Sequence, residues 1–320
     1  MQYAAGVDFG GSSAKIGLVA RDGSILAKET VRVDSRASFE DVLGPVAARL
    51  SALVAARPKD DALIVAGIGM PGFIEKREGT VVGGAENILC LRGRSPQAFL
   101  EQALGVPAFS ENDATSAAAG ELVFGAGRKF SSFLLITLGT AIGGGLVLGG
   151  KVYRGFRGFA GEVGHMCLVP DGVVCNCGSR GCFEQYASGT AVVRTYRERL
   201  QKRGRDNSEA TAKTVFDLAR SGDVLARETI VEASRYVAQA LGSILNLLDV
   251  EACLVGGGVS EAGELLLEPV RQRLPDYCWP EIAQGVKVIP AELGNDAGIQ
   301  GAAAQALERL EGPEGRCRSQ

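Results

Sequence analysis

Residues 3–20 read Tyr-Ala-Ala-Gly-Val-Asp-Phe-Gly-Gly-Ser-Ser-Ala-Lys-Ile-Gly-Leu-Val-Ala, two apolar runs on either side of a turn of glycine and serine. Apolar runs bounded by turn residues predict strands at 3–9 and 14–20. The short turn leaves no room for a helix between these strands, so they are expected to be antiparallel neighbours. A second turn at 21–23 leads to a third strand, at 24–33. The chain is therefore expected to open with three antiparallel strands.

A second glycine-rich turn lies near the middle of the chain. It reads Leu138-Gly139-Thr140-Ala141-Ile142-Gly143-Gly144-Gly145, between strands predicted at 132–138 and 145–149. Residues 130–150 carry no charge, and an uncharged stretch of that length can cross a bilayer. Glycine and threonine weaken a helix, however, so two short buried strands are favoured over a membrane helix.

The rest of the chain alternates between helical and strand patterns. Helices are expected near 38–56 and 95–104, from 113 onward, and near 188–203, 214–220, 223–248 and 299–310, with strands at 62–68, 106–109, 252–255 and 286–290 and an irregular loop at 155–183. Each half thus begins with paired strands around a glycine-rich turn. This repetition predicts an α/β fold duplicated about a cleft.

Composition limits the class of protein. The 320 residues are 46% hydrophobic, with a formal net charge of −3 and a mean hydropathy of +0.11. These values predict a soluble globular protein of two domains with no general attraction to nucleic acid or membranes. The N-terminus lacks the basic and apolar regions of a secretion signal, so a cytoplasmic location is expected. A basic cluster between Arg194 and Arg205 is interpreted as a solvated helix face; it is also the only candidate for a basic groove, should the chain bind a polyanion such as polyphosphate.

A metal site is predicted from cysteine spacing. Three of the eight cysteines, Cys175, Cys177 and Cys182, lie in one short run, and the only histidine, His165, is ten residues before the first of them. Three thiols and one imidazole complete the tetrahedral shell of a structural Zn²⁺. The alternative is a set of unrelated reduced thiols and a buried histidine, which the clustering disfavours.

Three glycine-rich turns have the composition of phosphate sites, at residues 8–12, 138–145 and 255–260. Glycines let the backbone approach a phosphate, hydroxyls donate to it, and a carboxylate such as Asp8 can hold Mg²⁺ through water. The third turn runs from a strand into a helix, whose N-terminal amides suit a nucleotide. One such turn alone is equally compatible with a structural hairpin. The prediction rests on their order in one chain.

Two other nucleotide-binding classes fit poorly. No turn spells Gly-x-Gly-x-x-Gly between a strand and a helix, which disfavours a Rossmann dehydrogenase. The first turn leads into another strand. A Walker loop is absent, which disfavours a P-loop kinase.

The motifs taken together resemble the ROK family (repressors, open reading frames and sugar kinases) of the actin/hexokinase-like superfamily, over nearly the whole chain. The resemblance rests on the stretches Asp8-Phe9-Gly10-Gly11-Ser12, Glu111-Asn112-Asp113, 138–145, Ala160-Gly161-Glu162-Val163-Gly164-His165, 175–184 and Gly256-Gly257-Gly258-Val259-Ser260. Ser12 departs from the usual threonine and Ala141 from the usual glycine. Ser12 keeps the hydroxyl and Ala141 adds one methyl group, so these departures are expected to affect nucleotide affinity rather than abolish activity.

The resemblance implies a duplicated actin/hexokinase-like (ribonuclease H-like) fold of two α/β domains with an interdomain cleft. The smaller domain would comprise residues 1–112 plus about 299–320, with the first phosphate motif. The larger would comprise 113–298, with the second phosphate motif, the zinc loop and the adenosine motif.

The resemblance also implies transfer of the γ-phosphoryl group of ATP to the 6-hydroxyl of a hexose. Asp113 would be the general base; as a residue before an alanine-rich helix it also suits a helix cap, and both roles can hold at once. Sugar-binding positions would be Gly72, Asn87, Asn112, Glu162, His165 and Glu184. ATP and Mg²⁺ would be held by Asp8, Gly10, Gly11, Ser12, Lys15, Thr137, Gly139, Thr140, Gly256, Gly257 and Gly258.

Among family substrates, the loop from 169 to 189 is most similar to that of bacterial glucokinases, which implies D-glucose. N-acetylmannosamine, N-acetylglucosamine and fructose kinases share the same skeleton, and polyphosphate is an alternative donor. One nitrogen of His165 would bind zinc and leave the other for the sugar. A homodimer or higher homo-oligomer is expected.

The other class within the family is a sugar-responsive repressor or a sugar-sensing regulator without catalysis. Family repressors carry an N-terminal helix-turn-helix domain, whereas the first phosphate-motif strand here is predicted from residue 3. An enzyme is therefore the preferred reading, with no nucleic acid or membrane as partner.

Overall fold

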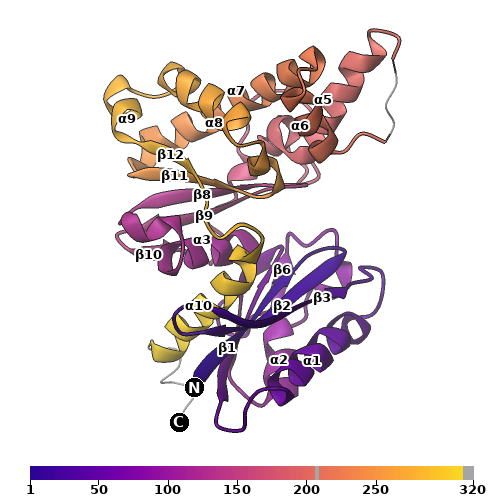
Figure 1. Ribbon diagram of the computed structural model, residues 1–320, viewed down its shortest axis with the longest axis vertical. Coiled ribbons are helices and arrows are strands. Elements are labelled where there is room, and N and C mark those ends of the chain that lie inside the picture. Colours follow the sequence, from indigo (N-terminus) through magenta and orange to yellow (C-terminus); the bar gives the residue numbers. More distant parts are fainter. Residues whose placement is uncertain (206–208, 313–320) are drawn as a thin grey trace. The chain divides into compact units, whose positions relative to one another are not determined.

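The computed structural model describes residues 1–205 and 209–312. Contacts divide the chain into two units (Figure 1). Unit 1 comprises Met1–Lys129, Gly145–Ala160 and Leu293–Gln320, and unit 2 comprises Phe130–Gly144 and Gly161–Glu292. This grouping assigns residues 113–129, 145–160 and 293–298 to unit 1, whereas the sequence-based division placed them in the larger domain. The domain boundaries stay a prediction, because a grouping by contacts does not test independent folding.

The first sheet contains the three strands expected at the start of the chain. Its order is β3-β2-β1-β4-β7. β1 pairs antiparallel with β2 and β2 with β3, whereas β4 runs parallel to β1 and β7 parallel to β4. The strands are β1 (Gln2–Phe9), β2 (Ser13–Ala20), β3 (Ile25–Arg32), β4 (Ala62–Met70) and β7 (Ala108–Asn112). The predicted antiparallel opening is confirmed.

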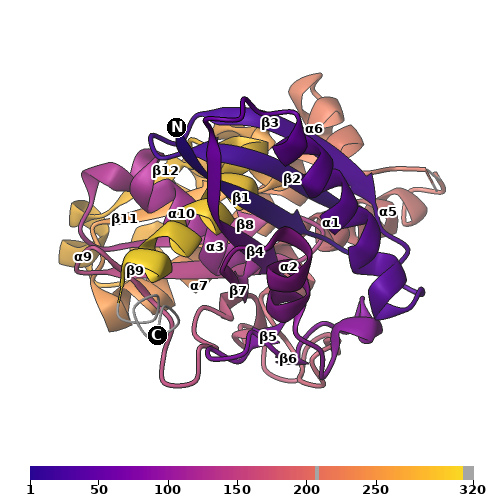
Figure 2. The same cartoon turned by 90° about the horizontal axis from the view of Figure 1, so that it is seen from below.

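Alternation along β1 gives this sheet two apolar faces. Tyr3, Ala5 and Val7 join a core that includes the buried side of α1 (Phe39–Ala55). Ala4, on the other face, packs with α10 (Ala297–Glu311). Figure 2 shows α1 and α10 on opposite faces of the sheet. The other long helices of unit 1 are α2 (Pro96–Leu104) and α3 (Asp113–Val123).

Helix α10 reaches the backbone of the sheet at two glycines. A Cβ atom at Gly67 would lie 1.8 Å from the carbonyl oxygen of Ala302, and one at Gly6 would lie 2.1 Å from that of Ile299. Because van der Waals contact needs more than 3 Å, only glycine fits at these positions. Contact with a helix was predicted at neither glycine, because glycines were interpreted by turn composition alone.

The second sheet repeats the order of the first, position for position, as β10-β9-β8-β11-β12. Its strands are β8 (Phe133–Leu138), β9 (Ile142–Leu148), β10 (Lys151–Tyr153), β11 (Ala252–Gly256) and β12 (Lys287–Pro290). β11 runs parallel to both β8 and β12. The two equal orders confirm the expected duplication of an α/β pattern, and the uncharged stretch 130–150 forms strands as predicted.

In the described ranges, the α-helices of unit 2 lie between strands of the second sheet in sequence, four of them between β10 and β11 and two between β11 and β12. They are α4 (Glu184–Ala187), α5 (Gly189–Gln201), α6 (Ala212–Arg220), α7 (Val224–Leu248), α8 (Glu264–Arg273) and α9 (Pro280–Gly285). The sequence pattern did not predict α8, which contains Pro269, or the short α9. It also missed β10 and the small hairpin of β5 (Phe73–Ile74) and β6 (Val81–Gly83), because two or three residues carry no periodicity.

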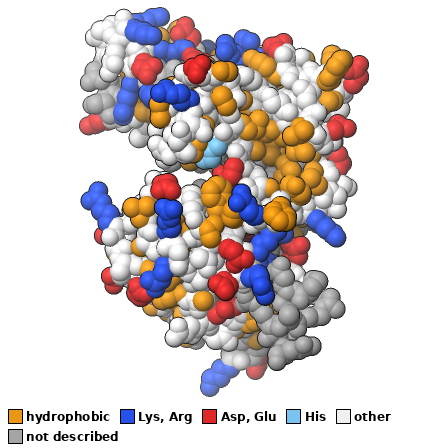
Figure 3. Space-filling view, turned by 180° about the vertical axis from the view of Figure 1, so that it is seen from behind, with side chains coloured by type: hydrophobic (Ala, Val, Ile, Leu, Met, Phe, Trp, Pro, Cys, Tyr) orange, Lys and Arg blue, Asp and Glu red, His pale blue; other side chains and the backbone are white. Residues whose placement is uncertain are grey.

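Within the described ranges, no helix has the length and apolar character needed to cross a membrane. On the face drawn in Figure 3, acidic and basic side chains are interspersed rather than gathered in one basic patch.

Candidate functional site

Asp113 is held at the point where a strand becomes a helix. β7 ends at Asn112 and α3 begins at Asp113. The Asn112 side-chain oxygen accepts hydrogen bonds from the backbone N–H groups of Ala114 (3.0 Å) and Thr115 (3.1 Å), so Asn112 is the helix cap. Asp113 Oδ1 accepts from the N–H of Ala114 at 2.8 Å. The carboxylate is thus oriented without serving as the cap.

The surroundings of Asp113 change its acidity. Desolvation by the surrounding protein raises the pKa of Asp113 to about 6, the hydrogen bond from Ala114 opposes the rise, and the negative charge of Asp8 adds to it. A carboxyl group with a pKa near neutrality is a better proton acceptor than an ordinary aspartate and is still ionised at pH 7. Perturbed carboxyls of this kind are typical of catalytic sites.

Other predicted residues of unit 1 lie around this carboxylate or the first turn. Asn112 Nδ2 donates to the carbonyl oxygen of Gly72 at 3.5 Å. Lys15 Nζ lies 3.3 Å from Asp8 Oδ2 in a partly buried ion pair. Asn87 adjoins the first turn, since a Cβ atom at Gly11 would lie 3.9 Å from the Asn87 Cβ. Unit 1 therefore brings the first phosphate motif close to the candidate base.

The four predicted zinc ligands form one cluster in unit 2. His165, Cys175, Cys177 and Cys182 offer donor atoms that all lie within 4.8 Å of one another. His165 Nδ1 is 3.6 Å from Cys175 Sγ, and Cys177 Sγ is 3.6 Å from Cys182 Sγ. Ligands of a tetrahedral Zn²⁺ with bonds of about 2.0–2.3 Å lie roughly 3.5–3.8 Å apart. The donor set and its spacing fit a structural zinc ion.

The cysteine thiols of this cluster differ in acidity. Burial raises the pKa of Cys182 to about 12. Burial acts in the same direction on Cys177, but hydrogen bonds from Ser179 and the neighbouring thiols lower its pKa to about 7. A bound divalent cation would favour the thiolate form of all three cysteines, because metal binding displaces the thiol proton.

The predicted sugar residues of unit 2 adjoin this cluster. Residues Val163–His165 form a turn of 3₁₀ helix, and His165 Nε2, on the ring side away from Cys175, lies 3.9 Å from Glu162 Oε2. Glu184 Oε2 accepts a hydrogen bond from the backbone N–H of Ile142 at 3.0 Å. Glu184 therefore links the cysteine loop to the second glycine-rich turn.

That turn opens onto a pocket of about 730 Å³. Gly139, Thr140 and Gly258, all predicted to bind nucleotide, line the pocket. Gly257 has a φ of +84°, and a Cβ atom there would lie 2.6 Å from the carbonyl oxygen of Leu138, so glycine is required where β11 passes this turn. The volume suits a nucleotide-sized ligand.

Helices α5 and α6 supply most of the remaining wall of this pocket, a contribution that was not predicted from the sequence. Its additional lining residues are Gly189, Thr190, Val193, Arg194, Arg197, Glu198, Gln201, Ala212, Lys213 and Val259. The reading of the basic cluster as a solvated face is therefore wrong for Arg194 and Arg197. These arginines are three apart on α5, which begins beside Thr140, whose carbonyl oxygen accepts a hydrogen bond from the Thr190 hydroxyl at 2.8 Å. This contact spans 50 positions, so the spacing of the arginines alone gave no signal of the pocket.

Comparisons with known proteins place these features in a family. The model of the ROK family matches residues 4–309. The chain belongs to the ROK family. It is 36% identical to a glucokinase of Thermotoga maritima over 96% of this chain and 98% of that one. This ROK protein is also similar in structure to a ROK family glucokinase of Streptomyces griseus solved with glucose and AMPPNP, with 36% identity, a TM-score of 0.83 and coverage of 96% and 99%.

A third relative is a regulator. The ROK protein matches a ROK family transcriptional regulator, described as a homologue of the E. coli MLC protein, with a TM-score of 0.86 at 26% identity. The match covers 96% of this chain but 78% of the regulator. The shared fold is the actin/hexokinase-like fold expected from the sequence, and it is common to enzymes and regulators of the family.

Proposed function

We propose that this protein is an ATP-dependent hexokinase that phosphorylates the 6-hydroxyl of D-glucose. The observation that carries the proposal is the oriented carboxylate of Asp113, with its pKa of about 6, in a chain that is 36% identical to a glucokinase over nearly its full length. The Streptomyces griseus relative solved with glucose and AMPPNP supports the choice of sugar and nucleotide.

Asp113 would act as general base. The sugar 6-hydroxyl is a poor nucleophile, and a carboxylate within hydrogen-bond reach orients it and accepts its proton as the γ-phosphoryl group moves. Glucose and ATP are then converted to glucose 6-phosphate and ADP, and the proton leaves through Asp113. The backbone bond from Ala114 keeps one carboxylate oxygen fixed and leaves the other for the hydroxyl.

The remaining residues would bind and orient the substrates. Carboxylates and amides suit sugar hydroxyls because each can engage two of them; the proposed set is Gly72, Asn87, Asn112, Glu162, His165 and Glu184. The proposed set for ATP is Asp8, Gly10, Gly11, Ser12, Lys15, Thr137, Gly139, Thr140, Gly256, Gly257 and Gly258. Mg²⁺, with Asp8 on its water shell, would neutralise charge on the phosphates.

We propose that zinc is structural in this enzyme. His165, Cys175, Cys177 and Cys182 would hold it, with His165 Nδ1 on the metal side because that nitrogen faces Cys175. His165 Nε2 then remains as a donor toward a sugar hydroxyl or Glu162. The zinc loop would thus set the orientation of His165 and, through residue 182, of Glu184.

A hexose panel tests the substrate. We expect kcat/KM with ATP to be highest for glucose among glucose, mannose, fructose, N-acetylmannosamine and N-acetylglucosamine, measured by coupled ADP release. If an N-acetyl sugar or fructose exceeds glucose tenfold, equivalent to about 1.4 kcal/mol, the family kinase activity stands but glucose is the wrong substrate. The same assay with polyphosphate in place of ATP tests the donor.

A sugar-sensing regulator is the second candidate, favoured by the TM-score of 0.86 to a family regulator. A regulator of this kind would bind glucose and release no ADP. Tight sugar binding together with turnover no faster than that of Asp113→Asn would establish this alternative.

We further propose that the protein is a homodimer or larger homo-oligomer in the cytoplasm, acting in carbohydrate metabolism. A reducing compartment suits the thiols, since Cys90, Cys167, Cys175, Cys177, Cys182, Cys253 and Cys278 are all unbridged in the described ranges. Light scattering of the purified protein measures the oligomeric state directly.

A further inference from the structure

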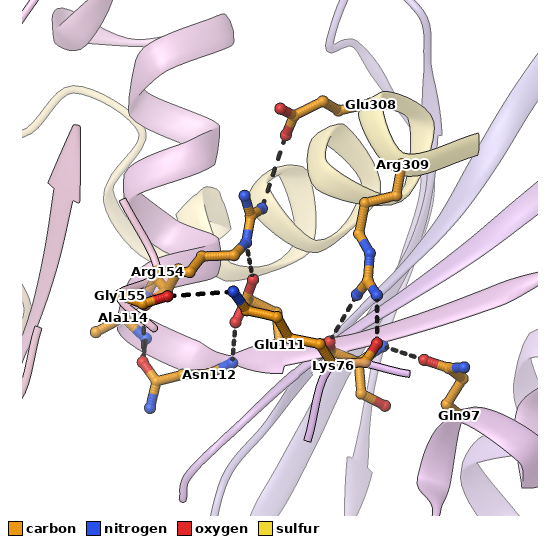
Figure 4. Close-up of polar contacts among 11 residues, drawn as sticks. Lys76, Gln97, Glu111, Asn112, Ala114, Arg154, Gly155, Glu308 and Arg309 are labelled. Carbon is orange, nitrogen blue, oxygen red and sulfur yellow. Dashed lines mark hydrogen bonds and ion pairs between the residues drawn. The ribbon is translucent and has the colours of Figure 1, made fainter. Parts of the chain in front are cut away.

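A network of charged side chains in unit 1 surrounds Glu111, which precedes Asn112 and the candidate base Asp113 (Figure 4). Glu111 is buried, with a side-chain exposure of 7%, and its Oε2 pairs with Nε of Arg154, which is 19% exposed. Arg154 is the residue directly after β10, and it lies 43 positions after Glu111 in the chain. A second, exposed carboxylate, Glu308, lies 3.7 Å from Nη2 of the same guanidinium. Arg154 therefore carries the charge that balances a buried carboxylate.

The other oxygen of Glu111 acts on the backbone of the site. Glu111 Oε1 accepts a hydrogen bond from the N–H of Asn112 at 3.2 Å. Asn112 in turn caps α3 through its own side chain, as described above. The Glu111 carboxylate thus connects Arg154 to the backbone N–H of Asn112, the residue that caps α3 and precedes the candidate base. A planar guanidinium can both orient such a carboxylate and compensate its negative charge.

Neighbouring contacts hold the partners in place on both sides. Lys76 Nζ donates to the carbonyl oxygen of Gly155, the residue after Arg154, at 3.2 Å. Arg309 Nη1 donates to the carbonyl oxygen of Ser110, the residue before Glu111, at 3.1 Å. The backbone is therefore held near both ends of the Arg154–Glu111 pair, and Arg154 is the cation that pairs with the Glu111 carboxylate.

We propose that Arg154 is a positioning residue for phosphoryl transfer, which acts through Glu111 on the peptide of Asn112 and so on the aim of the Asp113 carboxylate. This inference rests on the proposed function. Arg154 itself is not proposed to contact either substrate. Its removal would leave the Glu111 carboxylate buried without its cation and free to turn away from Asn112. A small displacement of a base lowers turnover strongly, whereas it changes substrate binding little.

The test is a double-mutant cycle on the full-length protein. Arg154→Met and Glu111→Gln are each expected to lower kcat by roughly 10-fold to 100-fold, with KM for glucose and ATP changed by less than about threefold. In the double variant the second substitution adds little to the first, because both break the same connection. Arg154→Lys keeps the charge but not the planar geometry, so its kcat lies between those of the wild type and Arg154→Met.

Folding is separated from positioning by measuring kcat per folded molecule, with the folded fraction taken from circular dichroism at the assay temperature. Arg94→Met is the matched control, because it removes an exposed ion pair with Glu40 and should leave kcat unchanged. The inference is overturned by additive effects on kcat, by an unchanged kcat per folded Arg154→Met molecule, or by a loss confined to KM. Absence of glucose phosphorylation in the wild type contradicts the proposed function instead, so the two failures are distinct.

Discussion

Asp113 combines a fixed orientation with a pKa of about 6, caused chiefly by desolvation and increased by Asp8. Only the ionised form can accept a proton. We therefore expect kcat to be nearly constant above pH 7 and to fall about tenfold per pH unit well below pH 6. The measurement is a kcat profile from pH 5 to 8 at saturating glucose and ATP. A profile flat down to pH 5 would mean that Asp113 is not the base.

Replacing this carboxylate should separate activity from stability. Asp113→Asn keeps the size of the side chain but cannot accept the proton, so kcat is expected to fall at least ~10²-fold while KM for glucose changes little. Near wild-type turnover would assign the base to another residue.

The same variant should gain stability at neutral pH. A folded-state pKa raised above the unfolded value means that ionisation of Asp113 costs folding free energy as pH rises from about 4 to 6. Asp113→Asn is therefore expected to have a higher free energy of unfolding than the wild type at pH 7.5, with the difference shrinking toward pH 4. Urea unfolding at both pH values measures this, and a variant less stable than the wild type at pH 7.5 would contradict the assignment of the pKa.

Residues of the site could be grouped from the sequence when their partners lie close to them along the chain. Asn112 and Asp113 are adjacent, and the zinc cysteines lie within one short run, so local spacing was enough to group them. Arg154 pairs with a residue 43 positions away, and no local pattern indicates such a partner. The pocket residues Arg194 and Arg197 were misread because charge alone does not distinguish a solvated helix face from the wall of a pocket.

At the scale of the element, the structure of the loop that carries the four candidate zinc ligands should depend on bound metal. Cys177→Ser removes one of three thiols, so purified protein is expected to lose most of about one Zn²⁺ per chain together with most of its activity. Metal analysis beside the kinase assay measures both. Cys90→Ser, which changes a thiol outside the cluster, is the control and should retain zinc. Full activity in zinc-free wild-type protein would rule out a structural role for the metal.

The contact between α10 and β4 gives a second prediction for an element. In Gly67→Ala the new Cβ atom would meet the backbone oxygen of Ala302 at 1.8 Å, so the free energy of unfolding should fall by at least ~2 kcal/mol. Gly285→Ala is the control, because nothing lies within 4 Å of a Cβ atom there and the change should stay within about 0.5 kcal/mol. Urea unfolding compares the two, and equal stabilities would show that α10 shifts at little cost.

Elements were predictable where apolar periodicity is long. The opening strands and the helices α1, α5 and α7 agree with their sequence-based limits to within two residues. The strands β5, β6 and β10 have too few residues for a pattern, and they form because neighbouring backbone offers hydrogen bonds. Local sequence therefore predicts the framework but not the short pieces added to it by tertiary contacts.

At the scale of the whole molecule, the repeated strand order was the strongest inference from sequence. Two glycine-rich turns between paired strands predicted a duplication, and the orders β3-β2-β1-β4-β7 and β10-β9-β8-β11-β12 agree with it. The grouping of segments was harder to foresee. The family resemblance already implied that about 299–320 joins residues 1–112, but unit 1 also contains Gly145–Ala160, and no local pattern indicates that this segment joins the first sheet's unit.

Helix α10 is synthesised after the strands that it covers, and this order affects the folding of the nascent chain. Ala4, Val65 and Phe109 belong to a face of the first sheet that is covered by residues of α10, which begins at Ala297. At about 5–20 residues per second, a ribosome that has completed β4 needs roughly 11–45 s more to reach that helix. During this interval the nascent chain exposes an apolar sheet face, and exposed apolar surface of this kind favours aggregation. A premature stop codon shortly before residue 297 should therefore yield insoluble polypeptide in the cell rather than a shortened enzyme.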